Sequence, residues 1–95
     1  MTQKEILEGN KLIGEFDEIT KDIYGRYYKK GVFRGNSERD FIYHSDWNWL
    51  MPVVEKCFDI ECEKMSELKS KFDFWHIDLM FKVVVEFIKW YNQNK

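Results

Sequence analysis

Four side chains of this sequence have the chemistry to bind a transition metal or to act as a nucleophile or a base. They are His44, Cys57, Cys62 and His76. Zinc ligands usually occur in closely spaced pairs such as Cys-x-x-Cys, because one short segment then supplies two ligands. None of the four residues belongs to such a pair, and Cys57 falls near an apolar stripe, where a free cysteine behaves as a small hydrophobic side chain. We therefore expect no metal site and no cofactor.

Ser45 follows His44 directly, which places a hydroxyl next to an imidazole in the sequence. Nucleophilic catalysis needs a base and an oxyanion site arranged around the nucleophile in space, and adjacency in sequence does not supply that geometry. Ser45 is better explained as the N-cap of a helix, with Asp46 beside the positive end of the helix dipole. The glycines also lack the neighbours of a phosphate-binding loop. The sequence therefore predicts a protein without enzyme activity.

The composition indicates a folded chain rather than a disordered one. Apolar residues make up 44% of the 95 residues and aromatic residues 18%, so much apolar surface is available for burial. This length predicts a single domain over residues 1–95. No apolar leader opens the chain, and no run of about 18 apolar residues occurs, so we expect a cytoplasmic protein without a membrane partner. The net charge of −2 is too small to indicate a partner.

The N-terminal segment has the apolar spacing of a helix from about Gln3 to Phe16. Thr2, with Glu5 three residues later, fits a capping box at its start. Gly9 and Gly14 each weaken such a helix by about 1 kcal/mol relative to alanine. That cost suggests either the close approach of another backbone or simple tolerance.

The middle of the chain has residues that favour short antiparallel strands. We expect a hairpin of Arg26–Tyr28 and Val32–Arg34, joined by a turn at Lys29–Gly31. Phe41–Tyr43 could form a third strand. A two-stranded hairpin alone would be marginally stable, so this small sheet within residues 23–43 must pack on helices.

The next segment predicts a helix that begins after Ser45. Its apolar residues share one face: Trp47, Leu50, Met51, Val54 and Phe58. Pro52 comes too late to be a first-turn proline, so it either kinks this helix or starts a second helical piece near Met51. Helix could continue through Glu63, because no residue there breaks it.

The last helix is expected from about His76 to Asn92, with Ser70 and Asp73 as cap candidates before it. Its apolar stripe comprises Met80, Val83, Val84, Phe87, Ile88 and Tyr91. The expected fold is therefore α+β, with about three helices packed with a small antiparallel sheet. An all-α bundle with a long loop is the alternative.

Trp49, Trp75 and Trp90 fall off these apolar stripes. Trp49 lies about 200° around its helix from Trp47, and Trp90 is similarly displaced from the stripe of the last helix. Exposed tryptophans often mark protein interfaces. Buried ones would form a second core layer, and the spacing does not distinguish these alternatives. Trp49, Trp90 and His44 are the predicted interaction residues.

Residues 21–39 are basic and rich in tyrosine, with six basic residues against two acidic ones. Basic side chains interleaved with aromatic rings can contact phosphates and stack on bases. The candidate nucleic-acid contacts are Lys29, Lys30, Arg34, Tyr27 and Tyr28. The structural alternative is that the rings face the core while the lysines lie on a solvated edge, where they oppose edge-to-edge aggregation.

Three strings carry a family resemblance: Glu8–Ile13, Tyr43–Lys56 and Val84–Asn92. They resemble a group of small uncharacterised proteins of bacterial genomes, phages and prophages, which share the order of N-terminal helix, Tyr-rich middle, tryptophan segment and C-terminal helix. More distantly, the pattern is similar to phage α-β-α sandwich domains. Cys57–Lys71 departs from the strand-like residues expected after the second string. The resemblance implies a fold and a mobile-element origin, with no catalytic residue.

Two hypotheses for function follow. The first is a non-enzymatic protein-interaction module that binds an unknown protein partner, or a second copy of itself, through Trp49, Trp90 and His44. The alternative is single-stranded nucleic-acid binding through residues 21–39.

Overall fold

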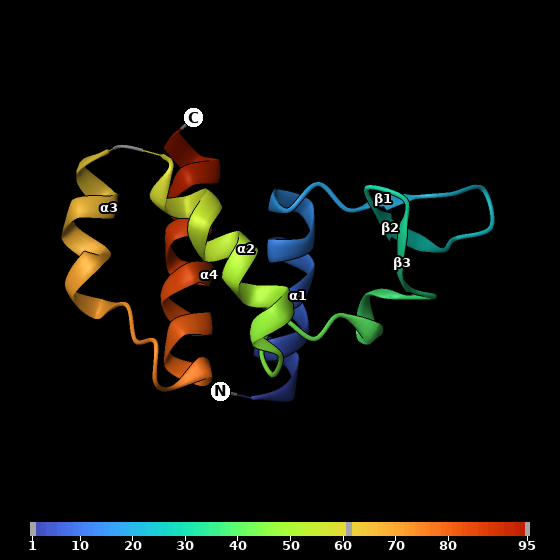
Figure 1. Ribbon diagram of the computed structural model, residues 1–95, viewed down its shortest axis with the longest axis horizontal. Helices are drawn as coiled ribbons and strands as arrows, with labels where there is room; N and C mark the ends of the chain where they lie inside the picture. Colours follow the sequence, from blue (N-terminus) through green and yellow to red (C-terminus); the bar gives the residue numbers. More distant parts are fainter. Residues whose placement is uncertain (1, 61, 95) are drawn as a thin grey trace. The chain divides into compact units, whose positions relative to one another are not determined.

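The computed structural model describes residues 2–60 and 62–94, and within them it has an α+β fold (Figure 1). The described residues form four α-helices, two short 3-10 helices and a three-stranded antiparallel sheet, so the all-α alternative is excluded and the expectation of about three helices is one too few. The chain divides into two compact units, Met1–Ile42 and Tyr43–Lys95. The prediction of one domain stays a prediction, and the two units are described in turn.

The first unit begins with helix α1, Gln3–Phe16, as predicted. The capping box is confirmed, because the Thr2 side chain accepts a hydrogen bond from the Glu5 backbone and the Glu5 side chain accepts one from the Thr2 backbone. Gly14 is buried, and a Cβ built there would lie 2.7 Å from Cε2 of Phe41. The expected close packing at this glycine therefore exists, but against an aromatic side chain rather than another backbone.

The sheet has the strand order β1-β2-β3, formed by Thr20–Lys21, Tyr27–Lys29 and Val32–Gly35. The predicted hairpin exists, but its first strand begins and ends one residue later than expected. Lys29 therefore belongs to β2, and Lys30 and Gly31 form the turn at positive φ. The third strand is β1 rather than Phe41–Tyr43, so this part of the prediction is wrong. Thr20 and Lys21 pair with β2 instead, and the Thr20 hydroxyl donates to the Tyr28 carbonyl at 3.3 Å.

A 3-10 helix, η1, explains why Phe41 does not continue the sheet. η1 spans Glu38–Asp40, and the Ser37 side chain caps it by accepting a hydrogen bond from the Arg39 backbone. Phe41 follows with only 3% of its surface exposed, and its ring meets the Tyr27 ring edge-on at 5.1 Å. The side chain of Phe41 therefore packs against Tyr27 of β2, while its backbone lies outside the strands of the sheet.

The second unit begins with helix α2, Trp47–Phe58, which continues through Pro52. Its N-cap is Asp46, whose side chain accepts from the Asn48 backbone at 2.8 Å, so the assignment of the cap to Ser45 is wrong. Ser45 is exposed in the preceding turn. A single helix over this range excludes a second helical piece starting near Met51.

Helix α2 ends at Phe58, so the expected continuation through Glu63 is wrong. A new helix, α3, spans Glu63–Leu68 and is followed by the 3-10 helix η2, Lys69–Lys71. The Cys62 side chain caps α3 by accepting from the Met65 backbone, with Sγ and N 3.4 Å apart. Cys62, which the sequence placed inside one continuous helix, is therefore the N-cap of a separate helix, α3.

Helix α4, Ile77–Asn94, packs against both α2 and α3 (Figure 1). The predicted stripe is buried except for Tyr91, which is half-buried, and Phe81 and Val85 are buried as well, because the helix has a neighbour on two sides. On α2 the buried residues are Leu50, Val53, Val54 and Cys57. Phe58, predicted to face the core, is exposed beside the Phe72 ring, so the buried face is rotated toward Val53 and Cys57.

Candidate binding surfaces

The four metal-ligand or nucleophile candidates lie in separate environments. The His44 ring is half-buried and lies 6.1 Å from the Phe81 ring, while Cys62 caps α3. Cys57 is fully buried, and this desolvation raises the pKa of its thiol to about 12, so it stays protonated and unreactive. Among residues 2–60 and 62–94, no three His, Cys, Asp or Glu side chains are grouped to hold a metal ion.

The predicted interaction residues Trp49 and Trp90 are both half-buried. The Trp49 ring meets the Tyr43 ring edge-on, with the centroids 5.1 Å apart, and the Trp90 ring lies 6.1 Å from that of Phe87. Tyr43 and Phe87 are core residues. Each of these tryptophans therefore covers the core with part of its ring and leaves the remainder to solvent.

The most exposed tryptophan is Trp75, with 91% of its surface accessible. It lies in a turn that we call the aromatic turn, Asp73–His76, in which Phe74 is 51% exposed. Asp73 Oδ1 accepts hydrogen bonds from the backbone N–H groups of Trp75 and His76, at 2.8 and 3.0 Å, and Oδ2 lies 3.0 Å from His76 Nδ1. The side-chain hydrogen bond with His76, and then the one from the Trp75 backbone, lower the pKa of Asp73.

The first unit contains a turn of the same kind, Asp22–Arg26, which we call the tyrosine turn. Asp22 Oδ1 accepts from the backbone N–H groups of Tyr24 and Arg26, both at 2.9 Å, and Arg26 Nε donates to Oδ2 at 2.9 Å. Desolvation acts to raise the pKa of Asp22, but these hydrogen bonds outweigh it and lower the pKa below its usual value. Tyr24 is 75% exposed, and Ile23 before it is exposed as well. Both turns therefore hold an exposed aromatic residue two positions after an aspartate.

The candidate nucleic-acid residues divide into packed and exposed ones. Lys29 forms an ion pair with Asp17, in which both side chains are largely buried. Tyr27 contacts Phe41, and Tyr28 contacts Phe33 across the strand pair at 5.7 Å. Arg34 is half-buried in the middle of β3. Of the predicted five, only Lys30 is exposed, at the tip of the hairpin.

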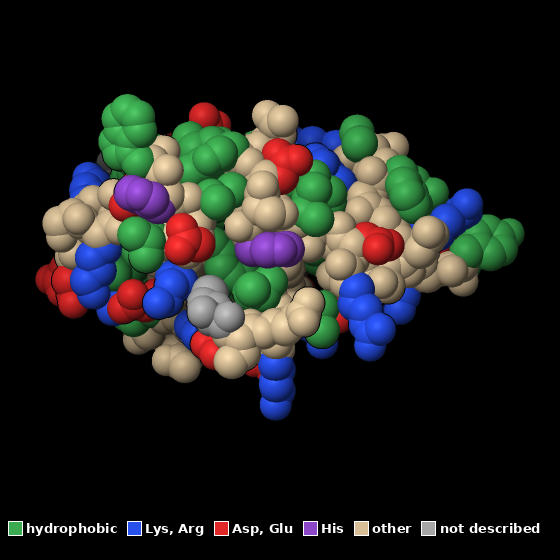
Figure 2. All heavy atoms as spheres, turned by 90° about the horizontal axis from the view of Figure 1, so that it is seen from below, with side chains coloured by type: hydrophobic (Ala, Val, Ile, Leu, Met, Phe, Trp, Pro, Cys, Tyr) green, Lys and Arg blue, Asp and Glu red, His purple; other side chains and the backbone are tan. Residues whose placement is uncertain are grey.

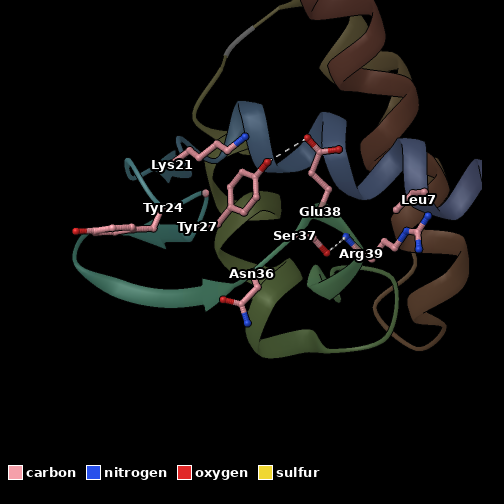
Figure 3. Close-up of a pocket in the computed structure, with 9 residues that line it drawn as sticks. Leu7, Lys21, Tyr24, Tyr27, Asn36, Ser37, Glu38 and Arg39 are labelled. Atoms are coloured by element: carbon pink, nitrogen blue, oxygen red, sulfur yellow. Dashed lines mark hydrogen bonds between the residues drawn. The ribbon is translucent and has the colours of Figure 1, made fainter.

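The first unit has an open trough of about 520 Å³ between the sheet and α1 (Figure 3). Figure 3 shows that it runs from Tyr24 and Lys21 at one end to Leu7 and Arg39 at the other. Tyr27, Glu38 and the polar residues Asn36 and Ser37 line it between these ends.

Two cationic side chains lie over tyrosine rings at or beside this trough. Arg26 lies over the Tyr24 ring, 5.0 Å from its centroid, and Lys21 Nζ is 5.8 Å from that of Tyr27. The Tyr27 hydroxyl donates to Glu38 Oε1 at 3.3 Å. Desolvation, together with the charge and hydrogen bond of Glu38, raises the pKa of Tyr27, so the phenol remains a donor at neutral pH.

The site residues predicted from the sequence did not include Tyr24 or Trp75, although both lie in the segments that prompted those predictions. The signal was present in the sequence, because Asp22-Ile23-Tyr24 and Asp73-Phe74-Trp75 share the order aspartate, large apolar residue, aromatic residue. An aspartate that accepts from backbone N–H groups two residues later defines an Asx turn, which fixes the backbone and leaves the following side chains outside the core. The periodicity of helices and strands does not detect such turns.

Comparison of the chain with protein-family models, curated proteins and solved structures finds no match. The resemblance to a group of small bacterial and phage proteins therefore stays a prediction. In the described part of the chain, no helix combines the length and apolar character needed to cross a bilayer.

Proposed function

We propose that this chain is a non-enzymatic interaction module that docks on a partner protein through the aromatic turn. The observation that carries this proposal is Trp75, a large aromatic side chain that is 91% exposed on a hydrogen-bonded backbone. Tryptophan is enriched among the residues that contribute most to binding at protein interfaces. Burying Trp75 and Phe74 in a partner would remove much apolar surface from water without first unfolding any part of the second unit.

The hydrogen bonds to Asp73 support this role because they fix the backbone on which both rings stand. A pre-ordered anchor loses less conformational entropy on binding than a flexible loop. The turn therefore presents Phe74 and Trp75 in one arrangement, which is the property needed to fit a shaped pocket.

The charges beside the aromatic turn favour a protein pocket over a lipid surface. Asp73 precedes the two rings and Asp78 follows them on the first turn of α4. The exposed lysines nearest in sequence, Lys69 and Lys71, lie before Asp73 on η2, where Lys71 Nζ is 3.9 Å from Glu86 Oε1. Carboxylates are repelled by anionic lipid headgroups, whereas a protein pocket can supply basic groups at its rim. Figure 2 shows charged side chains of both signs interspersed with exposed hydrophobic ones on the face that it draws.

Trp49, Trp90 and His44 have a smaller part in this proposal. All three are half-buried, and the two tryptophans lie against core rings. In this proposal they contact the partner at the edge of the interface, while Trp75 is the residue that inserts into it.

The test is a quantitative affinity purification from a bacterial lysate with the wild-type chain and two variants. Trp75→Ala removes the anchor, and Ile23→Ala removes an equally exposed apolar side chain of the first unit as a matched control. We expect a specific protein to be retained by the wild type and by Ile23→Ala, and to be reduced at least tenfold by Trp75→Ala, since a hot-spot residue contributes about 2 kcal/mol or more. Direct titration with that purified protein should reproduce the ranking.

Sedimentation of the purified chain separates a distinct partner from a second copy. A monomer at high concentration is expected. A dimer that Trp75→Ala dissociates would show that the turn binds a second copy and would overturn the proposal of a distinct partner. Retention of every bound protein by Trp75→Ala would remove the aromatic turn as the docking site.

A further inference from the structure

We propose that the trough of the first unit is a binding site for single-stranded nucleic acid, with one base stacked on Tyr24 and the backbone phosphates held by Lys21 and Arg39. This inference goes beyond the protein-docking role of the aromatic turn, because it concerns a different unit and different residues. It also replaces most of the residues that the sequence suggested for nucleic-acid contact.

Tyr24 has the geometry of a stacking platform. The Arg26 guanidinium lies over its ring at 5.0 Å, and the side chain remains 75% exposed, so the face opposite Arg26 can receive a base. The hydrogen bonds from the Tyr24 and Arg26 backbones to Asp22 hold the ring at the end of the trough (Figure 3). A nucleobase has a π-face whatever its sequence, so such a ring accepts any base.

Two exposed cations lie along the trough at positions suited to phosphates. Lys21 comes from the same end of the trough as Tyr24 and extends its ammonium toward Tyr27, 5.8 Å from the centroid of that ring. Arg39 lies at the opposite end, near Leu7 (Figure 3). Glu38 is the carboxylate among the lining residues, and it accepts the hydrogen bond of the Tyr27 hydroxyl. Lys21 and Arg39, set against Glu38, leave the lining residues with an excess of one positive charge, which favours an anionic ligand over a neutral one.

The shape of the trough favours a strand over an enclosed small molecule. Its volume of about 520 Å³ falls in the range of ligand sites, but it is open to solvent along its length. A strand can lie in such an open trough, where the amide of Asn36 and the hydroxyl of Ser37 provide polar groups between Tyr24 and Arg39. A duplex keeps its bases stacked on one another, so it cannot place one on Tyr24.

The decisive measurement is fluorescence anisotropy of a labelled 12-nucleotide single strand, at about 20 and 200 mM salt. We expect binding at low salt that weakens as salt rises. Tyr24→Ala should weaken it about tenfold, while Tyr24→Phe keeps the ring and should bind as the wild type does. Lys21→Gln and Arg39→Gln should each reduce the slope of log affinity against log salt by about 0.7.

Trp75→Ala and Lys82→Gln are the controls, because they alter an exposed aromatic and an exposed cation of the second unit. Both should bind the strand as the wild type does, which separates this site from the aromatic turn. Circular dichroism confirms that each variant is folded. Absence of binding at low salt, equal affinity for a duplex, an unchanged affinity of Tyr24→Ala, or equal competition by polyglutamate of the same charge would each overturn the proposal.

Discussion

The two units of this protein present an aromatic residue by the same turn, but they are stabilised by different interactions. In each turn an aspartate accepts two backbone hydrogen bonds, and a nitrogen-bearing side chain contacts the same carboxylate: the Arg26 guanidinium at Asp22, and the His76 imidazole at Asp73. Among the described residues, the buried hydrophobic side chains of the first unit are Ile13 and Phe41 alone, and all the others belong to the second unit.

This difference in apolar burial decides which side chains of each unit are available to bind a ligand. In the second unit, the residues that suggested chemistry are parts of the structure: Cys57 fills the core, Cys62 caps a helix and His44 lies against Phe81. In the first unit, little apolar burial is available, and ring contacts, turns and an ion pair hold the sheet. Some of its cations and rings remain at the surface, where a ligand can reach them, among them Lys21, Tyr24 and Arg39.

The largest expected effect comes from removing a core ring of the second unit. Phe87 on α4 has no exposed surface, and Phe87→Ala should lower the free energy of unfolding by about 3–5 kcal/mol. Leu79→Ala on the same helix is the control, because Leu79 is exposed and its truncation should cost less than about 1 kcal/mol. Urea denaturation followed by circular dichroism measures both. Equal costs for the two variants would contradict the assignment of the core.

The ion pair of the first unit should have the next largest effect. Asp17 and Lys29 are exposed by only 6% and 18%, so Asp17→Asn leaves a largely buried ammonium without its partner. We expect a loss of about 2–4 kcal/mol, measured by urea denaturation, with faster amide exchange in β2 showing that the sheet is affected.

A second substitution tests whether the lost charge is the cause. Lys29→Met added to Asp17→Asn removes the unpaired ammonium and keeps the apolar stem, so the double variant should recover part of the lost stability. A double variant no more stable than Asp17→Asn would mean that Asp17 acts through its other contacts at the end of α1. In that case the first unit would depend less on charge pairing than the comparison suggests.

Local signals in the sequence predicted most of the elements of the fold. The capping box of Thr2 and Glu5, the glycine in the hairpin turn and the apolar period of α4 each depend on residues within a few positions of one another. The errors arose where a local signal had a competitor. Asp46 and Ser45 are both good caps, and nothing in the sequence between Phe58 and Glu63 breaks a helix, although α3 begins with its own cap.

The candidate sites were harder to predict because exposure depends on tertiary packing. Trp49 and Trp90 were placed off the apolar stripes, yet each lies partly on a core ring: Trp49 on Tyr43, which no stripe includes, and Trp90 on Phe87 of the stripe itself. Lys29 and Lys30 are adjacent and chemically identical, but one is paired with Asp17, twelve residues away, and the other is exposed. Such long-range pairing leaves no mark within a short segment of sequence.

The smallest expected effect distinguishes the two turns themselves. Both aspartates have a pKa below the usual 3.8, so the folded state binds fewer protons than the unfolded state near this pH. The contribution of each ionised carboxylate is therefore complete above about pH 4 and is lost as the pH falls through the lowered pKa. Carboxyl NMR shifts between pH 6 and 2 should show both pKa values below 3.8.

His76→Gln should then separate the turns, because the side-chain hydrogen bond with His76 is the largest cause of the lowered pKa of Asp73. At Asp22 desolvation raises the pKa, and the backbones of Arg26 and Tyr24, followed by the Arg26 side chain, lower it. The pKa of Asp73 should rise toward 3.8 and that of Asp22 should stay unchanged, with Trp75 losing part of its order in amide relaxation. If Asp73 does not respond, its backbone hydrogen bonds alone hold the aromatic turn, and only the tyrosine turn then depends on a side-chain pair as well, that of Arg26 with Asp22.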